Sequence, residues 1–411
     1  MTVIGDLVTE IKKETAANNP YYTHIPDVEM VCRGLEGLDS IIGNEKVKLK
    51  AVKQFRHILV IGAEKDDKYM ESAPMMNTCL FGDPGTGKTT IAGYLALIWA
   101  GSGYLERPTK KRIEVVTETN DTWAVVLTNV FLFLMMVYMF YLLYTATENW
   151  RRSGSMKAFV AYFFLFILTF LVIFFFVVTV GSVYSSVTYT VPKSEDVEVK
   201  YMPQVVSATR GTFTGQYLGE TEKRTVAFLE ANRGNVIILD EAYNLCQDDR
   251  DTYGKQAAAE IVRFLSENPH ALVLILAGYE DDLVTGLFRI QKGMERRFLW
   301  KFYCEGYTPE EIYQIFVRHA KDRGYTVEDE RIKSLIVERS SLFRNYGGDC
   351  ARLFDYSQQE YSEQFLSGKV KNRVLSYEMV LEGVRELDAI NTKVSQQKKG
   401  TLSEIEKIFS R

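Results

Sequence analysis

A glycine-rich loop in the first quarter of the chain carries residue types that bind phosphate groups. The loop reads Gly82-Asp83-Pro84-Gly85-Thr86-Gly87-Lys88-Thr89, with Thr90 after it, and fits the pattern GxxxxGK(S/T) in full. Its glycines let the backbone curl so that N–H groups face phosphate, and the helix that follows adds a favourable dipole. Lys88 would hold the β- and γ-phosphates, and Thr89 would ligate Mg²⁺. The loop therefore predicts a binding site for ATP.

Two carboxylates follow an apolar run much later in the chain. Residues 236–239 are continuously apolar, and Asp240 and Glu241 come directly after them. Phosphoryl transfer uses a metal-linked carboxylate and a group that orients the attacking water. We therefore expect Asp240 to be the second Mg²⁺ ligand and Glu241 to be the catalytic carboxylate. An acidic pair at a strand end is weak evidence alone, and the glycine loop is what strengthens it.

Alternating strands and helices are needed to position these two motifs. Residues 76–81 form a short apolar run into the glycine loop, and residues 89–100 continue as an apolar helix. Residues 236–240, which are apolar up to the final Asp240, and residues 272–277 contain β-branched side chains, as in strands covered on both faces of a parallel sheet. The alternation over residues 76–302 predicts a large α/β domain.

Helical patterns flank the α/β segment. Residues 1–75 are polar and largely helical, and we expect an N-terminal helical linker there. Residues 303–392 predict an α-helical lid domain, whose first helix has Thr308 as cap, Pro309 at its first position and Glu311 at its third. The polar tail, residues 393–411, would dock only as a short terminal helix.

Two membrane-length apolar segments separate the two motifs. Residues 123–144 and 158–183 contain no charged residue, and tryptophan and tyrosine cluster toward their ends. About 20 apolar residues in a helix cross a hydrocarbon core. We therefore predict an inserted two-helix transmembrane hairpin over residues 119–190. The alternative, a buried core hairpin, would need a cavity for nearly all of these side chains.

The hairpin prediction also sets the topology. Two spans return the chain to its starting side, and the lysines and arginines that flank their outer ends favour a cytosolic ATPase domain. Residues 111–118 and 186–191 could pair as a short stalk. The chain is therefore predicted to be an integral, multi-pass membrane protein whose partners include the lipid bilayer.

Composition excludes several other classes of function. The net charge of −4 and the pI near 5.8 provide no basic field, so no nucleic-acid partner is expected. The five cysteines are far apart and form no CxxC, which argues against a disulfide framework or a zinc site. ATP turnover is the only chemistry that the motifs support.

The motifs together resemble the CbxX/CfqX-type branch of the AAA+ ATPases, which includes red-type Rubisco activase and the sporulation protein SpoVK. The stretches that carry the resemblance are 38–43 with 47–48, the loop 82–90, Gly215-Gln216-Tyr217-Leu218-Gly219-Glu220-Thr221, and Ile238-Leu239-Asp240-Glu241-Ala242-Tyr243-Asn244-Leu245. Ala277-Gly278-Tyr279 and Gly293-Met294-Glu295-Arg296-Arg297-Phe298 are also similar. The resemblance spans roughly residues 35–120 and 200–385, outside the apolar insertion. It implies an AAA+ P-loop NTPase fold.

The resemblance implies roles in nucleotide binding and in gripping a substrate. Ile41, Ile42 and Gly43 should line the adenine pocket. Tyr217 and Leu218 should form the pore loop that grips a threaded polypeptide, and an exposed tyrosine between glycines suits such a mobile loop. The alternative for Tyr217 is an ordinary aromatic residue in a turn.

Two arginines have roles that the resemblance implies for a ring. Arg297, with Arg296 beside it, matches the arginine finger that reaches into a neighbour's ATP site, although a solvated surface pair is the alternative. Arg352 is either the second sensor of the nucleotide or a structural residue of its helix. A homo-oligomeric ring, with six subunits as the expected number, follows from Arg297.

We therefore expect a membrane-anchored AAA+ ATPase that hydrolyses ATP with Mg²⁺ in a ring to thread or remodel a protein substrate, which the sequence does not identify. The alternative is a membrane scaffold or tether whose assembly is controlled by ATP binding. The two hypotheses differ in whether hydrolysis at Glu241 is needed for function.

Overall fold

The protein divides into two compact units in a computed structural model: Met1–Pro108 with Tyr201–Arg411, and Thr109–Lys200. The structure describes residues 2–63, 75–105, 111–117, 122–154, 156–157, 160–171, 174, 191–197, 203–217 and 219–409. The two motifs of the predicted ATP site both lie in the first unit, although Thr89 and Asp240 are 151 positions apart in the sequence.

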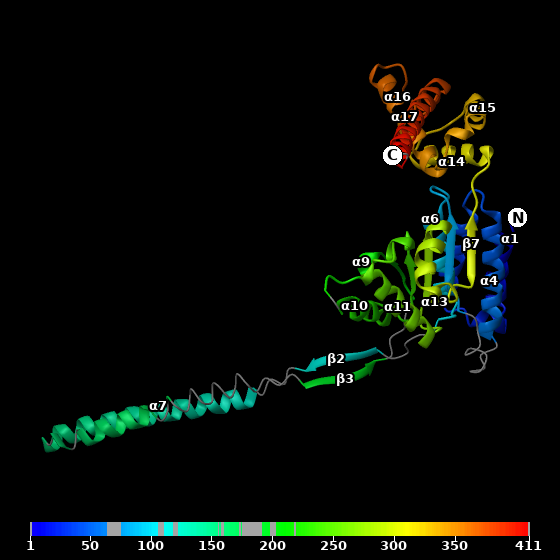
Figure 1. Ribbon diagram of the computed structural model, residues 1–411. Helices are drawn as coiled ribbons and strands as arrows, with labels where there is room; N and C mark the ends of the chain where they lie inside the picture. The colour runs from blue at the N-terminus through cyan, green and yellow to red at the C-terminus, as the bar shows by residue number, and fades with distance from the viewer. Residues whose placement is uncertain are drawn as a thin grey trace. The chain divides into compact units, whose positions relative to one another are not determined.

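A parallel sheet forms the centre of the first unit (Figure 1). Within the described residues it has five strands in the order β4-β5-β6-β1-β7, and each neighbouring pair is parallel. The strands are β1 (Thr78–Gly82), β4 (Val205–Ala208), β5 (Val236–Leu239), β6 (Val273–Gly278) and β7 (Trp300–Cys304). The predicted α/β fold with a parallel sheet is confirmed, and the glycine loop, Asp240 and Tyr279 all follow strands at its carboxyl edge.

Successive side chains of the central strands point to opposite faces of the sheet, and each face has its own core. Ile238 and Ile275 belong to one buried cluster, whereas Ile237 and Leu274 belong to the other. The second cluster is covered by helices that follow β4 and β5. These are α9 (Arg210–Phe213), α10 (Glu220–Ala231), the 3₁₀ turn η1 (Ala242–Leu245) and α11 (Thr252–Glu267). A π-helical turn η2 (Leu283–Phe288) between α12 (Glu280–Asp282) and α13 (Lys292–Glu295) completes this side.

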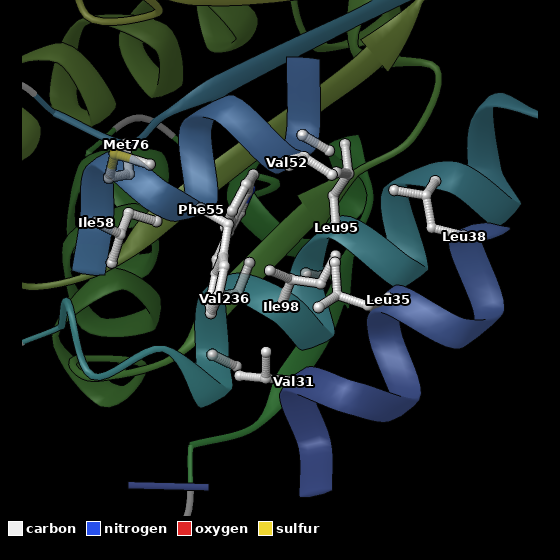
Figure 2. Close-up of a cluster of buried hydrophobic side chains, with 14 of the residues drawn as sticks. Val31, Leu35, Leu38, Val52, Phe55, Ile58, Met76, Leu95, Ile98 and Val236 are labelled. Atoms are coloured by element: carbon white, nitrogen blue, oxygen red, sulfur yellow. The ribbon is translucent and has the colours of Figure 1, made fainter. Parts of the chain in front are cut away.

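The N-terminal segment, which we expected to be a linker, forms much of the core on the first face. Its helices are α1 (Val3–Ala16), α2 (Pro20–Thr23), α3 (Val28–Asp39) and α4 (Glu45–Ala63). Figure 2 shows Phe55 of α4 beside Val236 of β5 and Ile98 of α6 (Lys88–Gly101), and Phe55 is fully buried. A Cβ on Gly34 would lie 2.9 Å from the Tyr94 carbonyl oxygen, so the absence of a side chain lets α3 approach α6 closely. The segment looks polar because only one stripe of each helix is apolar.

The C-terminal helices have a hydrophobic core of their own, which includes Phe316, Leu353 and Phe354. The helices are α14 (Pro309–Asp322), α15 (Glu330–Glu338), α16 (Gly347–Leu366) and α17 (Tyr377–Phe409), with a short turn η3 (Ser340–Leu342). The predicted start of α14 is confirmed, because the Thr308 hydroxyl accepts from the Glu311 N–H and the Glu311 carboxylate accepts from the Thr308 N–H. The predicted tail is not a separate short helix, since α17 continues through residues 393–409. We call α14–α17 the lid helices.

The second unit contains an antiparallel pair of strands and a long helix. β2 (Lys111–Thr117) pairs with β3 (Val191–Val197), so that Lys111 faces Val197 and Thr117 faces Val191. The expected stalk partner was 186–191; β2 pairs instead with the segment that begins at Val191, and residues 186–190 lie outside the described residues. α7 (Thr122–Ser153) runs past the expected end of the first span at residue 144.

One described helix is long and apolar enough to cross a membrane by its length and composition. This stretch of α7, Val130–Arg152, exposes large apolar side chains such as Phe133, Phe140 and Tyr144. Val160–Leu171 is a shorter apolar helix. The expected second span, 158–183, is described only at residues 160–171 and 174, and its remainder lies outside the described residues. The two-helix hairpin is therefore not established, and a single candidate span is what the described residues contain.

Candidate nucleotide site

The glycine loop links β1 to α6 with two residues in the left-handed backbone region. Gly85 has φ +77° and Gly87 has φ +84°, conformations that side chains with a Cβ rarely adopt. The Thr86 hydroxyl donates to the Asp83 carbonyl oxygen at 2.8 Å and closes the turn. The loop therefore has the curled backbone that phosphate binding requires.

Lys88 is buried at the first turn of α6 and points back over the loop. Its Nζ donates to the carbonyl oxygens of Gly82 at 2.8 Å and Asp83 at 2.9 Å. Burial lowers the pKa of Lys88, and the nearby Glu241 carboxylate opposes this effect. The ammonium group is thus held at the mouth of the loop, where bound phosphates would meet it.

A hydrogen bond joins the two motifs across the insertion. The Thr89 hydroxyl donates to Oδ2 of Asp240 at 2.6 Å, and Oδ1 of Asp240 accepts from the Glu241 N–H at 3.0 Å. Mg²⁺ prefers oxygen ligands and is usually bound by one or two protein groups together with phosphate and water. The hydroxyl and the carboxylate are hard oxygen donors side by side, so the residues present fit that ion.

Glu241 has an unusual backbone conformation and an unpaired carboxylate oxygen. Its φ of 49° and ψ of 46° lie in the left-handed region, which is costly for a residue with a side chain. Its Oε2 is buried and has no hydrogen-bond partner among the described residues. Such an oxygen is available to accept a proton from a water molecule.

A pocket beside the loop is lined from three parts of the first unit. Ile41 and Ile42 line it, as predicted for the adenine site, whereas Gly43 does not; Gly43 packs against the Glu311 side chain with φ +69°. The other lining residues are Gly85, Gly87, Thr90, Tyr94, Tyr307, Ile315, Arg318, His319, Asp322 and Gly347. The lining residues that α14 contributes follow no sequence motif and were not predicted. A second pocket next to the loop is lined by Gly82, Asp83 and Pro84 with Tyr279 and Tyr303.

Tyr307, which lies just before α14, and Gly347 of the lid helix α16 both contact the loop. The Tyr307 hydroxyl donates to the Thr86 carbonyl oxygen at 2.9 Å, and the Gly347 N–H donates to the Gly85 carbonyl oxygen at 3.1 Å. Arg318 of α14 donates to the Ser40 carbonyl oxygen at 2.6 Å, just before Ile41. The lid helices therefore supply part of the wall of this pocket, through α14 and Gly347 of α16.

The structure does not bring either predicted arginine to the loop. Arg352 donates to Oδ1 of Asp349 at 3.2 Å, and it is absent from the lining of the described pocket beside the loop. The Arg297 guanidinium donates to the Ser266 hydroxyl at 2.7 Å and to the Gly293 carbonyl oxygen at 3.3 Å. A finger that acts on a neighbouring subunit would not need contacts with its own loop.

The predicted pore loop presents Tyr217 to solvent. The Tyr217 side chain is 73% exposed. Oε2 of Glu220 accepts from the N–H groups of Gln216 at 2.8 Å and Tyr217 at 3.1 Å, and Gly219 has φ +80°. Leu218 lies outside the described residues. The carboxylate of Glu220 thus fixes the backbone that carries an exposed aromatic ring.

The curled glycine loop follows β1, and the acidic pair follows β5, which is separated from β1 by one strand of the sheet. This arrangement defines the class of P-loop nucleoside triphosphatases. Residues 194–301 match the ATPase family associated with various cellular activities (AAA). These residues are therefore similar to an AAA ATPase domain, and the match supports the prediction of ATP hydrolase activity.

Known relatives agree with the branch that the sequence resembles. The chain is 32% identical to Protein CbbX of Cereibacter sphaeroides over 127 residues, which are 31% of this chain and 41% of that protein. It is 26% identical to Stage V sporulation protein K of Bacillus subtilis over 126 residues, 31% of this chain and 39% of that protein. The chain thus spans about two fifths of the length of these relatives. The RuvB Holliday junction branch migration motor of Thermotoga maritima is similar over 84% of this chain and 70% of its own, at 12% identity and a TM-score of 0.42.

Proposed function

We propose that this chain is a membrane-anchored AAA+ ATPase that assembles into a ring and uses ATP hydrolysis to thread or remodel a protein. The observation that carries the proposal is the hydrogen bond of 2.6 Å between Thr89 and Asp240. This contact joins the two halves of an ATP site although the apolar insertion lies between them in sequence. The insertion is therefore compatible with an intact motor.

The chemistry assigned to the site follows from its donors and acceptors. Lys88 and the loop N–H groups would bind the phosphates, and Thr89 and Asp240 would hold Mg²⁺, which supplies charge neutralisation when bound. Glu241 would orient the attacking water and accept its proton through the unpaired Oε2. Ile41 and Ile42 would contact the adenine, with Gly43 only shaping the turn beside them.

Ring assembly and threading are supported by two side chains that the ATP site does not use. Arg297 would leave Ser266 and reach a neighbour's phosphates, where an arginine supplied in trans stabilises charge on the transferred group. Tyr217 would grip the polypeptide, because a large exposed ring on a fixed backbone offers contact area at low entropic cost. A hexamer is the proposed ring, and Arg352 the proposed second sensor once it leaves Asp349.

Membrane anchoring is supported by the exposed apolar surface of α7. Exposed phenylalanines such as Phe133 and Phe140 would be unfavourable in water over the length of a helix but are favourable in lipid. We propose that 158–183 forms the second span and that the ATPase domain faces the cytosol. Resistance of the full chain to carbonate extraction from membranes is the expected result, and release into the soluble fraction would contradict the anchor.

The threading mechanism is tested by two substitutions in the full chain. Glu241→Gln should bind ATP, stop hydrolysis and retain its substrate, which can then be identified from isolated membranes. With that substrate, Tyr217→Ala should hydrolyse ATP but fail to remodel it, whereas Tyr21→Ala, which removes an exposed tyrosine of α2, should behave as the wild type. Remodelling that survives Tyr217→Ala would exclude threading through this loop.

The same variant distinguishes the scaffold alternative. A scaffold controlled by ATP binding should still assemble and function as Glu241→Gln, because binding is retained. A remodelling motor should stall. Full function of Glu241→Gln would therefore replace the proposed motor with a tether.

A further inference from the structure

One arginine connects the segments that follow two neighbouring strands of the sheet. Arg210 is the first residue of α9, after β4, and its side chain reaches the segment after β5. Nη1 donates to the carbonyl oxygens of Asn244 at 3.1 Å and Leu245 at 3.2 Å, and Nη2 donates to Oδ1 of Asp251 at 2.8 Å. Nη1 also donates to Oδ2 of Asp251, which makes the ion pair bidentate. We call these contacts the Arg210 clamp.

The ion pair of the Arg210 clamp is shielded from solvent. The Arg210 side chain is 33% exposed and that of Asp251 is 11% exposed. Burial raises the pKa of the Asp251 carboxyl, but hydrogen bonds from Arg210 and from the Gly254 N–H outweigh this effect and lower that pKa overall. Asp251 also caps α11, because its carboxylate accepts from the Gly254 N–H at 2.9 Å. A planar guanidinium that donates to two carbonyls and a carboxylate therefore fixes α9 against the segment after β5.

The side chain of Arg210 holds the turn that begins after the residue assigned to catalysis. η1 starts directly after Glu241, and the Asn244 N–H donates to the Glu241 carbonyl oxygen at 2.9 Å. Asn244 and Leu245 belong to the same 3₁₀ turn, and their carbonyl oxygens are the ones that Arg210 binds. The turn after Glu241 and the Arg210 guanidinium are therefore one hydrogen-bonded unit.

The main chain of Arg210 holds the start of the loop that carries Tyr217. The Arg210 carbonyl oxygen accepts from the Thr214 N–H at 3.0 Å and from the Thr214 hydroxyl at 3.1 Å. The next residue, Gly215, donates its N–H to the Thr221 hydroxyl at 3.0 Å. Only Gln216 lies between Gly215 and Tyr217. A short run of hydrogen-bonded residues thus joins Arg210 to the exposed aromatic ring.

We propose that Arg210 is a positioning residue that transmits a change at the bound nucleotide to the loop that carries Tyr217. The inference rests on the proposed motor function and deepens it, because it names the side chain through which the ATP site and the gripping loop are connected. The side chain and the main chain of one residue engage the two segments, so a movement of either segment reaches the other. Arg210 lines neither described pocket beside the glycine loop, so its loss should spare nucleotide binding.

The test places a nitroxide spin label on this loop in the full chain. All five cysteines are buried, so Tyr217→Cys adds a thiol that can be labelled selectively at an exposed position. Binding of ATPγS, a slowly hydrolysed ATP analogue, should change the mobility of the label in an otherwise wild-type background. Arg210→Met together with Asp251→Asn should abolish most of that change. This double variant breaks the link without leaving an unpaired buried charge, and asparagine still caps α11.

A second ion pair of the same segment provides the matched control. Arg289, which directly follows η2, donates to Oδ2 of Asp249 at 3.0 Å, so this pair does not involve α9. Arg289→Met together with Asp249→Asn should leave the response of the label intact. In both double variants the affinity for ATPγS should change by less than about threefold, because neither pair lines the described pockets beside the glycine loop.

Loss of the response in the Arg210 double variant alone supports the inference. A response that survives there, or that is lost equally in the control, would overturn the inference while leaving ATP binding intact. Binding of ATPγS to the wild-type background without any response of the label would also overturn it. Failure to bind ATPγS at all would overturn the proposed function and this inference with it.

A milder variant decides the question if the Arg210 double variant does not fold. Arg210→Lys keeps the charge opposite Asp251 but loses the planar fork that engages the carboxylate and both carbonyls together. A response of the label that is reduced in Arg210→Lys supports the link, and a full response overturns it.

Discussion

Replacing Gly85 by alanine probes the contact between the glycine loop and the lid. A Cβ added at Gly85 would lie 1.8 Å from the Asn345 carbonyl oxygen, which precedes α16. Non-bonded atoms need roughly 3.5 Å, so the loop and the lid segment must separate by more than about 1.5 Å. That movement breaks the hydrogen bond of 3.1 Å from the Gly347 N–H to the Gly85 carbonyl oxygen.

The magnitude combines two costs. A left-handed conformation costs a residue with a Cβ about 1–2 kcal/mol, and a lost hydrogen bond costs about 1 kcal/mol. The free loop of Gly85→Ala can relax away from this geometry, but ATP binding must restore it. We therefore expect ATP affinity to fall by about 2–3 kcal/mol, or roughly 30- to 150-fold.

The assay is equilibrium titration of the purified full chain with a fluorescent ATP analogue. Gly93→Ala is the matched control, because a Cβ on Gly93 of α6 meets nothing within 4 Å. This control should retain affinity and gain about 0.5–1 kcal/mol in unfolding free energy, as expected for alanine in a helix. If Gly85→Ala bound the ATP analogue with wild-type affinity, the reasoning would be refuted, because the contact with the lid would then not affect the conformation of the loop.

The remaining predictions concern stability and thiol reactivity. Phe55→Ala should lower the unfolding free energy by about 3–5 kcal/mol in urea titrations. Leu49→Ala, on the exposed face of α4, should lower it by less than about 0.5 kcal/mol. Equal losses of unfolding free energy in the two variants would restore the linker interpretation of residues 1–75. Thr308→Ala should lower the unfolding free energy by about 1 kcal/mol, and Thr308→Ser should lower it much less, because serine keeps the cap of α14. Equal losses in the two variants would show that the Thr308 hydroxyl does not stabilise the helix as a cap. Burial raises the pKa of the Cys304 thiol to about 12, so at pH 8 it should react with iodoacetamide only after unfolding, and rapid labelling of the folded chain would contradict its burial.

Much of the nucleotide site could be predicted because its motifs are local. Gly82–Thr89 lie in one turn, and Asp240 and Glu241 follow one apolar strand, so that residue order alone indicates their chemistry. The parallel sheet could be predicted for the same reason, since buried strands are continuous apolar runs. The cap of α14 depends on four consecutive residues and was also predicted.

Other features depend on contacts between distant residues, which no local pattern contains. The lining of the pocket by Arg318, His319 and Asp322 requires the lid to fold over the loop. The pairing of Arg352 with Asp349 competes with the sensor role that the family resemblance implied. The expected second span could not be judged in the same way, because most of it lies outside the described residues.

The sequence by itself determined that this chain has an ATP site on a parallel sheet and an apolar insertion between its two motifs. Tertiary structure alone decided that the N-terminal helices belong to the core, because each helix has a narrow apolar stripe whose partner is elsewhere in the chain. It also stacked Tyr243 on Tyr279 and placed Lys88 over the Tyr279 ring. Stacking of two rings follows from the pairing of β5 with β6, and strand order is a property of the folded sheet.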